Sequence, residues 1–229
     1  QENIDFTIFS GDYETDVIAD LVAGNADFGI CTSDSIISAR LAGQDIVALA
    51  SIFRQSPMVV MAFADSGIVH PQDLVGKTVG VISTEFDNTW DAQFLAMLKN
   101  ADVDPDSINY VYLEEYVGAN DLLSGRMDAA SAMYTTNEPL QAGLDGYEMS
   151  QIYYIDYGIN FYTELLCATG NFVRQNPDLV QRFVRTTFEG YQYAIENPAE
   201  AVEISLPYDE NMDPELQALT MQEQIPLID

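Results

Sequence analysis

Carboxylates and aromatic rings are the side chains with which this sequence could bind a small molecule. Asp34 and Glu138 each follow a short apolar run, at the start of an expected helix. A carboxylate accepts hydrogen bonds from amino groups and repels anions, and rings such as those of Trp90 and Tyr134 stack on flat ligands. These residue types predict a pocket for a planar heterocycle that carries an amino group.

A structural role is open for each of these residues. Acidic side chains in the first turn of a helix satisfy backbone amides, so Asp34 and Glu138 can be caps. Trp90 begins the apolar stripe of its helix and can belong to the core. Arg54 can pair with a carboxylate near a hinge instead of touching a ligand.

The motifs of catalysis and metal binding are missing from the sequence. It contains no Gly-rich phosphate loop, no nucleophile elbow and no metal-ligand spacing, and its single histidine, His70, stands beside Pro71. Cys31 and Cys167 cannot form a zinc site alone. We therefore expect no catalytic residue, no metal and no cofactor. Each cysteine ends an apolar run and is expected to be a buried thiol, since a disulfide would require their strands to be neighbours.

The charge balance excludes whole classes of partner. Eight Lys and Arg stand against 37 Asp and Glu, which gives a formal net charge of −29 over 229 residues. Such a field repels phosphate backbones and anionic lipid headgroups, so we expect no nucleic acid partner. No apolar run approaches the ~18 residues of a membrane span, so we expect no direct membrane insertion. The acidity also hints at a saline or extracytoplasmic setting.

Strands alternate with helices over most of the chain. Short apolar runs between turn residues predict strands, and apolar residues on one helical face predict helices. The expected strands are Phe6–Phe9, Phe28–Cys31, Ile46–Phe53, Met58–Phe63, Thr78–Ile82, Tyr110–Leu113 and Ala129–Tyr134. The expected helices are Thr15–Ala23, a segment capped by Ser33 or Asp34 that runs to Leu41, one from Thr84 or Asp87 to Asn100, Asn120–Leu123, and most of the chain after Asn176. This alternation is typical of an α/β fold with parallel strands.

An internal sequence repeat suggests that the α/β unit occurs twice. Leu21–Asp27 and Leu122–Asp128 share a helix end, a glycine and an aspartate, and each leads into a strand and then a hydroxyl-rich turn. Two copies about a hundred residues apart indicate two similar lobes, although the unit is common enough to recur by chance.

Ligands of open parallel sheets collect beyond the carboxyl ends of the strands. If two lobes face each other, these ends line one cleft. The candidate ligand-binding residues are therefore Ser10, Tyr13, Thr32, Asp34, Arg54, Trp90, Tyr134, Thr135, Asn137, Glu138, Tyr157 and Tyr162.

Several segments together resemble the thiamine-pyrimidine-type solute-binding proteins of ABC importers, within the wider group of alkanesulfonate, taurine and nitrate binders. The resemblance covers essentially the whole chain. It rests on Leu21–Ile30 (LVAGNADFGI), Asp65–Ile68 (DSGI), Asp73–Val81 (DLVGKTVGV), Tyr134–Pro139 (YTTNEP), Asp156–Tyr162 (DYGINFY) and Tyr193–Glu200 (YAIENPAE).

The resemblance implies a type II periplasmic-binding-protein fold, in which two α/β lobes joined by two hinge crossings trap a ligand by closing. Lobe 1 would comprise residues 1–57 and 159–229, and lobe 2 residues 58–158. The Asn-Glu-Pro segment, which contributes to ligand binding in the family, maps to Asn137 and Glu138. Relatives begin with a further strand that carries a Trp-x-Pro-Asn-x-x-His-type motif, so lobe 1 is expected here without its first strand–helix unit and with an unpaired sheet position.

The implied function is the solute-binding component of an ABC importer. The protein would act as a monomer in the periplasm or outside the cell, with a lipid anchor upstream of Gln1 as one arrangement, and deliver its ligand to an ABC permease. A thiamine pyrimidine precursor is the first ligand, riboflavin the second, and a sulfonate or nitrate the third, because Arg54 is the only cation in the candidate set. A fungal pyrimidine-forming enzyme shares the fold, but its cysteine cluster and active-site histidine have no match here.

Overall fold

A computed structural model describes residues 4–11, 15–83, 89–113, 119–208 and 211–228. By the contacts among its residues the chain divides into two compact units. The first comprises residues 1–54, 161–201 and 228, and the second residues 55–160, 202–227 and 229. The first two junctions follow Arg54 and Asn160.

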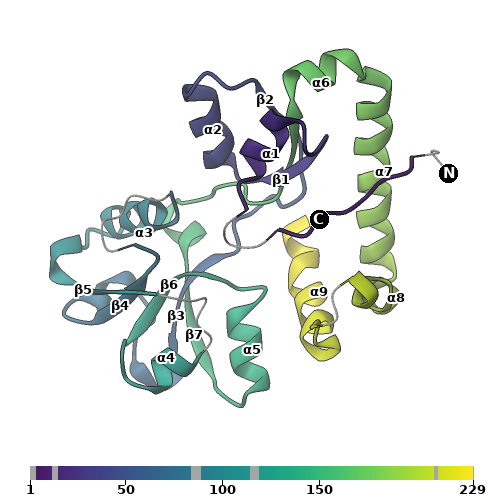
Figure 1. Cartoon of the computed structure of the whole chain (residues 1–229). Helices are drawn as coiled ribbons and strands as arrows, with labels where there is room; N and C mark the ends of the chain where they lie inside the picture. Colours follow the sequence, from purple (N-terminus) through teal and green to yellow (C-terminus); the bar gives the residue numbers. More distant parts are fainter. Residues whose placement is uncertain (1–3, 12–14, 84–88, 114–118, 209–210, 229) are drawn as a thin grey trace. The chain divides into compact units, whose positions relative to one another are not determined.

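The first unit is built on a three-stranded sheet in the order β1-β8-β2, in which β8 is antiparallel to both neighbours. Helices α1 and α2 cover one face of this sheet, where Leu21, Ile36 and Ala39 pack against Ile46 and Leu165. Helix α6 leads directly into the long helix α7 (Figure 1). The bounds are β1 Gly29–Cys31, β2 Ile46–Ser51, β8 Leu165–Thr169, α1 Val17–Ala23, α2 Ser33–Leu41, α6 Gly170–Gln175 and α7 Pro177–Glu196.

The expected strand at Phe6–Phe9 is wrong. Residues 4–11 form neither helix nor strand, and Phe6 and Phe9 are 63% and 75% exposed. A strand needs a partner for its backbone groups. In the sheet as described β1 is an edge strand, and the ring of Phe6 lies instead 6.5 Å from that of Phe183 on α7.

The expectation of two free thiols is also wrong, because Cys31 and Cys167 form a disulfide. Their strands, β1 and β8, are antiparallel neighbours, with Cys31 opposite Leu165 and Gly29 opposite Cys167. The two Cα atoms are therefore only 6.4 Å apart although 136 positions separate them in the chain. The sequence pattern did not identify β8 as a strand, so this proximity was missed.

The second unit contains a five-stranded sheet in the order β5-β4-β6-β3-β7. The predicted parallel pairing holds for β4 with β5 and β6, whereas β3 is antiparallel to both β6 and β7. The strands are β3 Met58–Phe63, β4 Thr78–Val81, β5 Asn109–Tyr112, β6 Ala129–Tyr134 and β7 Met149–Tyr153, and the α-helices are α3 Thr89–Asn100, α4 Ala119–Leu123 and α5 Glu138–Leu144. Short 3₁₀ turns occur at Ala64–Ser66, Pro71–Leu74, Pro105–Ser107 and Tyr154–Tyr157.

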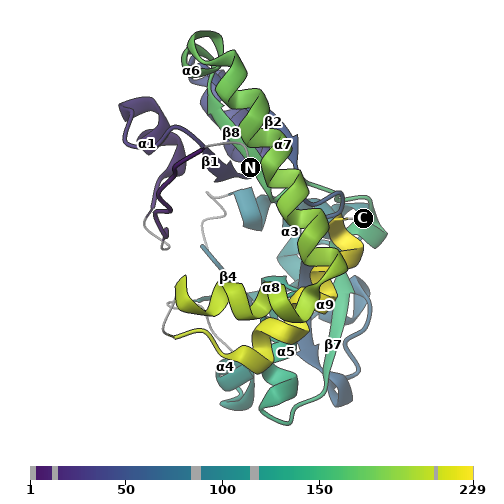
Figure 2. The same ribbon diagram turned by 90° about the vertical axis from the view of Figure 1, so that its right-hand side faces the viewer.

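The end of the chain is grouped differently from the expected division. Helix α8 (Pro198–Ser205) contains a third junction after Ala201, and residues 202–227, expected in lobe 1, belong to the second unit. The Thr220 hydroxyl on α9 (Pro214–Ile228) donates a 2.8 Å hydrogen bond to the Thr136 carbonyl. Figures 1 and 2 both show α9 next to α5.

The internal sequence repeat, Leu21–Asp27 and Leu122–Asp128, has the same local structure in each unit. Helices α1 and α4 end before Gly24 and Gly125, which adopt φ values of +78° and +72°. Only glycine takes this left-handed conformation freely, so it stops the helix and turns the chain into β1 or β6.

Candidate ligand-binding site

In the first unit the predicted ligand-binding residues collect at one edge of the sheet. The amino end of β8 lies between the carboxyl ends of β1 and β2, since Leu165 pairs with both Cys31 and Ser51. Beyond the ladder, the Ser33 amide donates to the Tyr162 carbonyl and the Ile52 amide to the Glu164 carbonyl, each at 2.8 Å. Thr32, Asp34, Arg54 and Tyr162 all belong to these three chain ends.

Thr32 fixes the start of α2. Its hydroxyl accepts a 3.3 Å hydrogen bond from the Ser35 amide, and the Ser35 hydroxyl accepts one of 3.2 Å from the Thr32 amide. This reciprocal capping box satisfies the helix start without a carboxylate. The expectation that Ser33 or Asp34 caps the helix is therefore wrong.

Asp34 is buried without a visible partner. The residue is 9% exposed, and neither carboxylate oxygen has a hydrogen-bond partner in the described part of the chain. The buried hydroxyl of Thr163 also has no hydrogen-bond partner in that part of the chain. Thr163 was not singled out from the sequence, because only the fold places it beside the start of α2.

Glu164 is a second carboxyl at this edge, half-buried, that sequence reasoning missed. Burial raises the pKa of Glu164 to about 7, and burial together with the nearby Glu164 charge raises the pKa of Tyr191 on α7. Leu165 and Cys167 face α1 and α2. Thr163 and Glu164 directly precede β8, and the alternation of side chains along an extended chain would put Thr163 on this face and Glu164 on the opposite one.

The remaining candidates of the first unit are less constrained. Ser10 is exposed in the irregular segment before α1, Arg54 is exposed at the end of the unit, and Tyr162 is 45% exposed. Tyr13 lies outside the described residues.

In the second unit the turn from β6 to α5 brings four predicted residues together: Tyr134, Thr135, Asn137 and Glu138. The buried Glu138 carboxylate accepts a 2.7 Å hydrogen bond from the Tyr134 amide and a 3.1 Å bond from the Asn137 side-chain amide. Glu138 therefore closes the turn.

A buried polar cluster positions the end of β6. Ala132 adopts φ +58° at an irregularity in the pairing of β3 with β6, and its amide donates a 3.1 Å hydrogen bond to the Tyr154 hydroxyl. Tyr154 is fully buried, and burial raises its pKa strongly. The Asp91 carboxylate accepts bonds of 3.1 and 2.7 Å from the Ile82 and Ser83 amides and so fixes the chain after β4.

Trp90 and Tyr157 are the two other candidate ligand-binding residues of the second unit. Trp90 lies in α3, but its side chain is outside what the structure describes. The hydroxyl of Tyr157 lies 3.4 Å from Nδ1 of His70, and its carbonyl accepts a 2.8 Å bond from the side chain of Asn100, the last residue of α3. Tyr157 thus contacts the loop that precedes β4, whereas Tyr134 and Glu138 follow the carboxyl end of β6.

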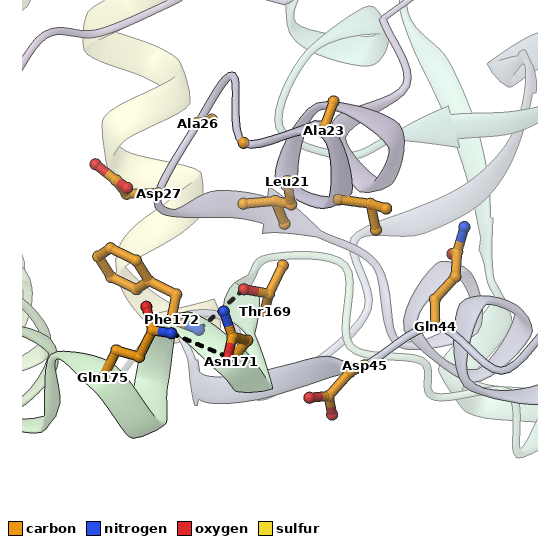
Figure 3. A pocket seen from close by; sticks show the side chains of 12 residues that line it. Leu21, Ala23, Ala26, Asp27, Gln44, Asp45, Thr169, Asn171, Phe172 and Gln175 are labelled. Atoms are coloured by element: carbon orange, nitrogen blue, oxygen red, sulfur yellow. Dashed lines mark hydrogen bonds between the residues drawn. The ribbon is translucent and has the colours of Figure 1, made fainter.

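A pocket of about 390 Å³ lies within the first unit, but it is not the predicted site. Figure 3 shows it between the end of α1, the loop before β2 and the start of α6, with Phe172 and Asp45 among its side chains. It lies at the amino end of β1, opposite the edge that carries Thr32 and Asp34. None of the predicted ligand-binding residues lines it.

The described residues contain neither a metal-binding cluster nor a membrane-spanning helix. Within these ranges, no group of three or more His, Cys, Asp and Glu is arranged to hold a metal ion. Over the same stretch of chain, no helix combines the length and apolar character needed to cross a membrane.

The curated relatives include binding proteins and one enzyme. The formylaminopyrimidine-binding protein of Halalkalibacterium halodurans is 27% identical over 207 residues, which cover 90% of this chain and 62% of that protein. Riboflavin-binding protein RibY of Chloroflexus aurantiacus is 25% identical over 229 residues, covering 96% and 63%. The 4-amino-5-hydroxymethyl-2-methylpyrimidine phosphate synthase of Legionella pneumophila is 24% identical, covering 89% and 64%. The chain thus spans less than two thirds of the length of these relatives.

Solved structures confirm the expected fold class. The periplasmic aliphatic sulphonate-binding protein SsuA from Escherichia coli matches with a TM-score of 0.75 at 18% identity, over 92% of this chain and 69% of that one. At this identity the likeness shows the type II periplasmic-binding-protein fold alone. The family model described as NMT1/THI5 like matches residues 1–201. The chain therefore belongs to the NMT1/THI5-like family.

Proposed function

We propose that this chain is part of the solute-binding component of an ABC importer and that it binds a small planar heterocycle with an amino group. A thiamine pyrimidine precursor is the first candidate. The observation that carries this proposal is the similarity over 90% of the chain to a protein named for binding formylaminopyrimidine. The candidate residues supply matching chemistry, because each unit presents a buried carboxylate in the first turn of a helix, Asp34 on α2 and Glu138 on α5.

The same carboxylates argue against an anionic ligand. The amino end of a helix ordinarily attracts anions, but a carboxylate placed there repels them. Of the eight Lys and Arg in the chain, only Arg54 belongs to the candidate set. A sulfonate or nitrate therefore fits less well than a neutral or protonated heterocycle.

The disulfide between Cys31 and Cys167 supports a location outside the cytoplasm. Disulfides such as Cys31–Cys167 persist in oxidising compartments and are rare in the cytosol. We infer a periplasmic or extracellular protein that acts as a monomer and hands its ligand to an ABC permease.

A thermal-shift panel tests the proposal. Any ligand that binds only the folded state raises the unfolding midpoint by mass action. We expect 4-amino-5-hydroxymethyl-2-methylpyrimidine to raise the midpoint and taurine and nitrate to leave it unchanged. A rise with the anions alone would overturn the proposal.

Riboflavin is a second candidate, favoured by the similarity to a riboflavin-binding protein over 96% of the chain. Stacking residues such as Tyr134 suit a flavin as well as a pyrimidine. Quenching of flavin fluorescence on titration with the protein, in competition with the pyrimidine, decides between the two ligands.

We propose a binding protein, although one relative is named as a synthase. The distinction is measurable, since a binding protein returns its ligand unchanged. After prolonged incubation, chromatography of the released compound should show the starting material only, and a new product would favour an enzyme.

A further inference from the structure

The start of α2 combines two unsatisfied buried polar groups on neighbouring segments. Both carboxylate oxygens of Asp34 and the hydroxyl of Thr163 are without partners among the described residues. The hydrogen bond from the Ser33 amide to the Tyr162 carbonyl, 2.8 Å long, places the two segments side by side. By strand alternation Thr163 also points to the face of the sheet that α2 covers.

Leaving these groups unsatisfied is costly. A buried carboxylate without a hydrogen-bond partner loses its hydration, the positive end of the helix dipole offsets only part of this cost, and folded proteins pair almost every such group. The backbone amides at the start of α2 do not donate to the Asp34 carboxylate. Thr32 and Ser35 form the capping box there instead. Three arginines of this unit pair with other carboxylates than Asp34: Arg40 and Arg174 pair with Asp45, and Arg182 pairs with Asp178.

The chemistry of the two groups defines what would satisfy them. An ionised carboxylate only accepts hydrogen bonds, so Asp34 requires an N–H or cationic donor. A threonine hydroxyl can donate to a ring nitrogen. An exocyclic amino group next to a ring nitrogen, as in a 4-aminopyrimidine, offers a donor and an acceptor side by side.

We propose that Asp34 and Thr163 form a subsite for the amino edge of the ligand, with Asp34 accepting from the amino group and Thr163 donating to the adjacent ring nitrogen. This inference rests on the proposed function and adds to it the group by which the first unit recognises the ligand. In the unliganded protein neither carboxylate oxygen of Asp34 has a described hydrogen-bond partner, and the ligand would supply one.

The test compares two ligands on three proteins. Calorimetric titration with 4-amino-2-methylpyrimidine and with 2-methylpyrimidine measures how much the amino group contributes to binding. We expect the wild-type chain to prefer the amino compound by about tenfold or more, the range for a hydrogen bond to a charged group. Asp34→Asn should abolish the preference, and Thr163→Val should weaken binding of both ligands, which share the ring nitrogen.

Thermal unfolding of the unliganded variants supplies a readout independent of the ligand. Asp34→Asn replaces a buried carboxylate that has no described hydrogen-bond partner by a neutral amide, and it should raise the unfolding midpoint by about 2–6 °C. The matched control is Asp178→Asn, the same change in the first turn of α7 at an exposed carboxylate paired with Arg182, and it should leave the midpoint unchanged or lower it slightly.

The outcomes separate this inference from the proposed function. If neither pyrimidine binds the wild-type chain, the pyrimidine candidate of the proposed function fails, and the subsite fails with it whatever the midpoints show. If both bind and Asp34→Asn keeps the full preference for the amino compound, the subsite is overturned while the function stands. A lower midpoint for unliganded Asp34→Asn would show that the carboxylate already has a partner and would also overturn the subsite.

Discussion

Glu164 is an acid whose protonation is coupled to folding. Burial at the amino end of β8 raises its pKa from 4.5 to about 7. Between these values the folded protein retains a proton that the unfolded chain has released. The unfolding free energy should therefore fall as the pH rises through this window and level off above it.

Replacing the carboxyl removes this dependence. At pH 8 Glu164→Gln should be more stable than the wild type by about 2–3 kcal/mol, and at pH 4 the two should be nearly equal. Urea unfolding at several pH values measures the difference. Glu203→Gln, at an exposed position of α8, is the control and should follow the wild-type profile. If the unfolding free energy of Glu164→Gln changed with pH in parallel with that of the wild type, the raised pKa of Glu164 would be contradicted.

The Cys31–Cys167 disulfide joins strands that lie far apart in the sequence. It closes a loop across 136 positions and so restricts the unfolded chain. Reduction should lower the unfolding free energy by about 3–5 kcal/mol. The double variant Cys31→Ser/Cys167→Ser should match the reduced protein and show no further response to dithiothreitol. Equal stability with and without reductant would argue that the bond does not stabilise the fold.

At the scale of single residues, sequence reasoning placed the two candidate carboxylates on the right elements but did not describe their environments. Asp34 and Glu138 were both expected at helix starts, and both are there. Their roles differ, because Glu138 binds the Tyr134 amide while Asp34 binds no described group. Hydrogen-bond partners depend on the path of the backbone over a few ångströms, which residue types and spacing do not determine.

The β6–α5 turn is held from a distant part of the chain. Thr220 on α9 donates a 2.8 Å hydrogen bond to the carbonyl of Thr136, which is buried beside Glu138. Thr220→Val keeps the shape of the side chain and removes the donor. We expect it to lower the stability by about 1 kcal/mol and to weaken binding of the proposed ligand through a less ordered turn.

A matched substitution separates this effect from the loss of any threonine hydroxyl. Thr187 on α7 donates instead to the Phe183 carbonyl one turn earlier in the same helix. That carbonyl keeps its helical partner when the hydroxyl is removed, so Thr187→Val should leave both stability and ligand affinity almost unchanged. Equal behaviour of the two variants would show that the Thr220 bond does not position the turn.

Elements stabilised by nearby residues were the predictable ones. Strand β6 runs from Ala129 to Tyr134 as expected, and α7 and α8 begin at Pro177 and Pro198, which favour the first turn of a helix. Strands β7 and β8 escaped detection, and the predicted strand at Phe6–Phe9 did not form. A strand exists only when another strand pairs with it, and that partner is a long-range property.

At the scale of the whole molecule, the family was predictable because it depends on many short segments at once. Motifs spread from Leu21 to Glu200 supported one resemblance, and the family model matches residues 1–201. The grouping of residues 202–227 with the second unit depends on tertiary contacts such as that of Thr220, and no segment of the sequence indicated it.

The net charge of −29 should make the stability of the whole chain depend on salt. The chain carries 37 acidic side chains and only eight basic ones, so the acidic side chains repel one another, and folding brings them closer together. The screening length shortens from about 30 Å at 0.01 M salt to about 3 Å at 1 M. Salt also weakens the few ion pairs, such as Arg174 with Asp45, but repulsive pairs greatly outnumber attractive ones.

We therefore expect the unfolding midpoint to rise steadily as NaCl increases from 0.01 to about 1 M, with most of the gain at low concentration, where screening changes fastest. Sucrose of matched osmolality controls for exclusion of solute from the surface and should give a smaller rise without that early steepness. A midpoint that is flat or falls over the low-salt range would mean that ion pairs, not mutual repulsion, dominate the electrostatics of the folded chain.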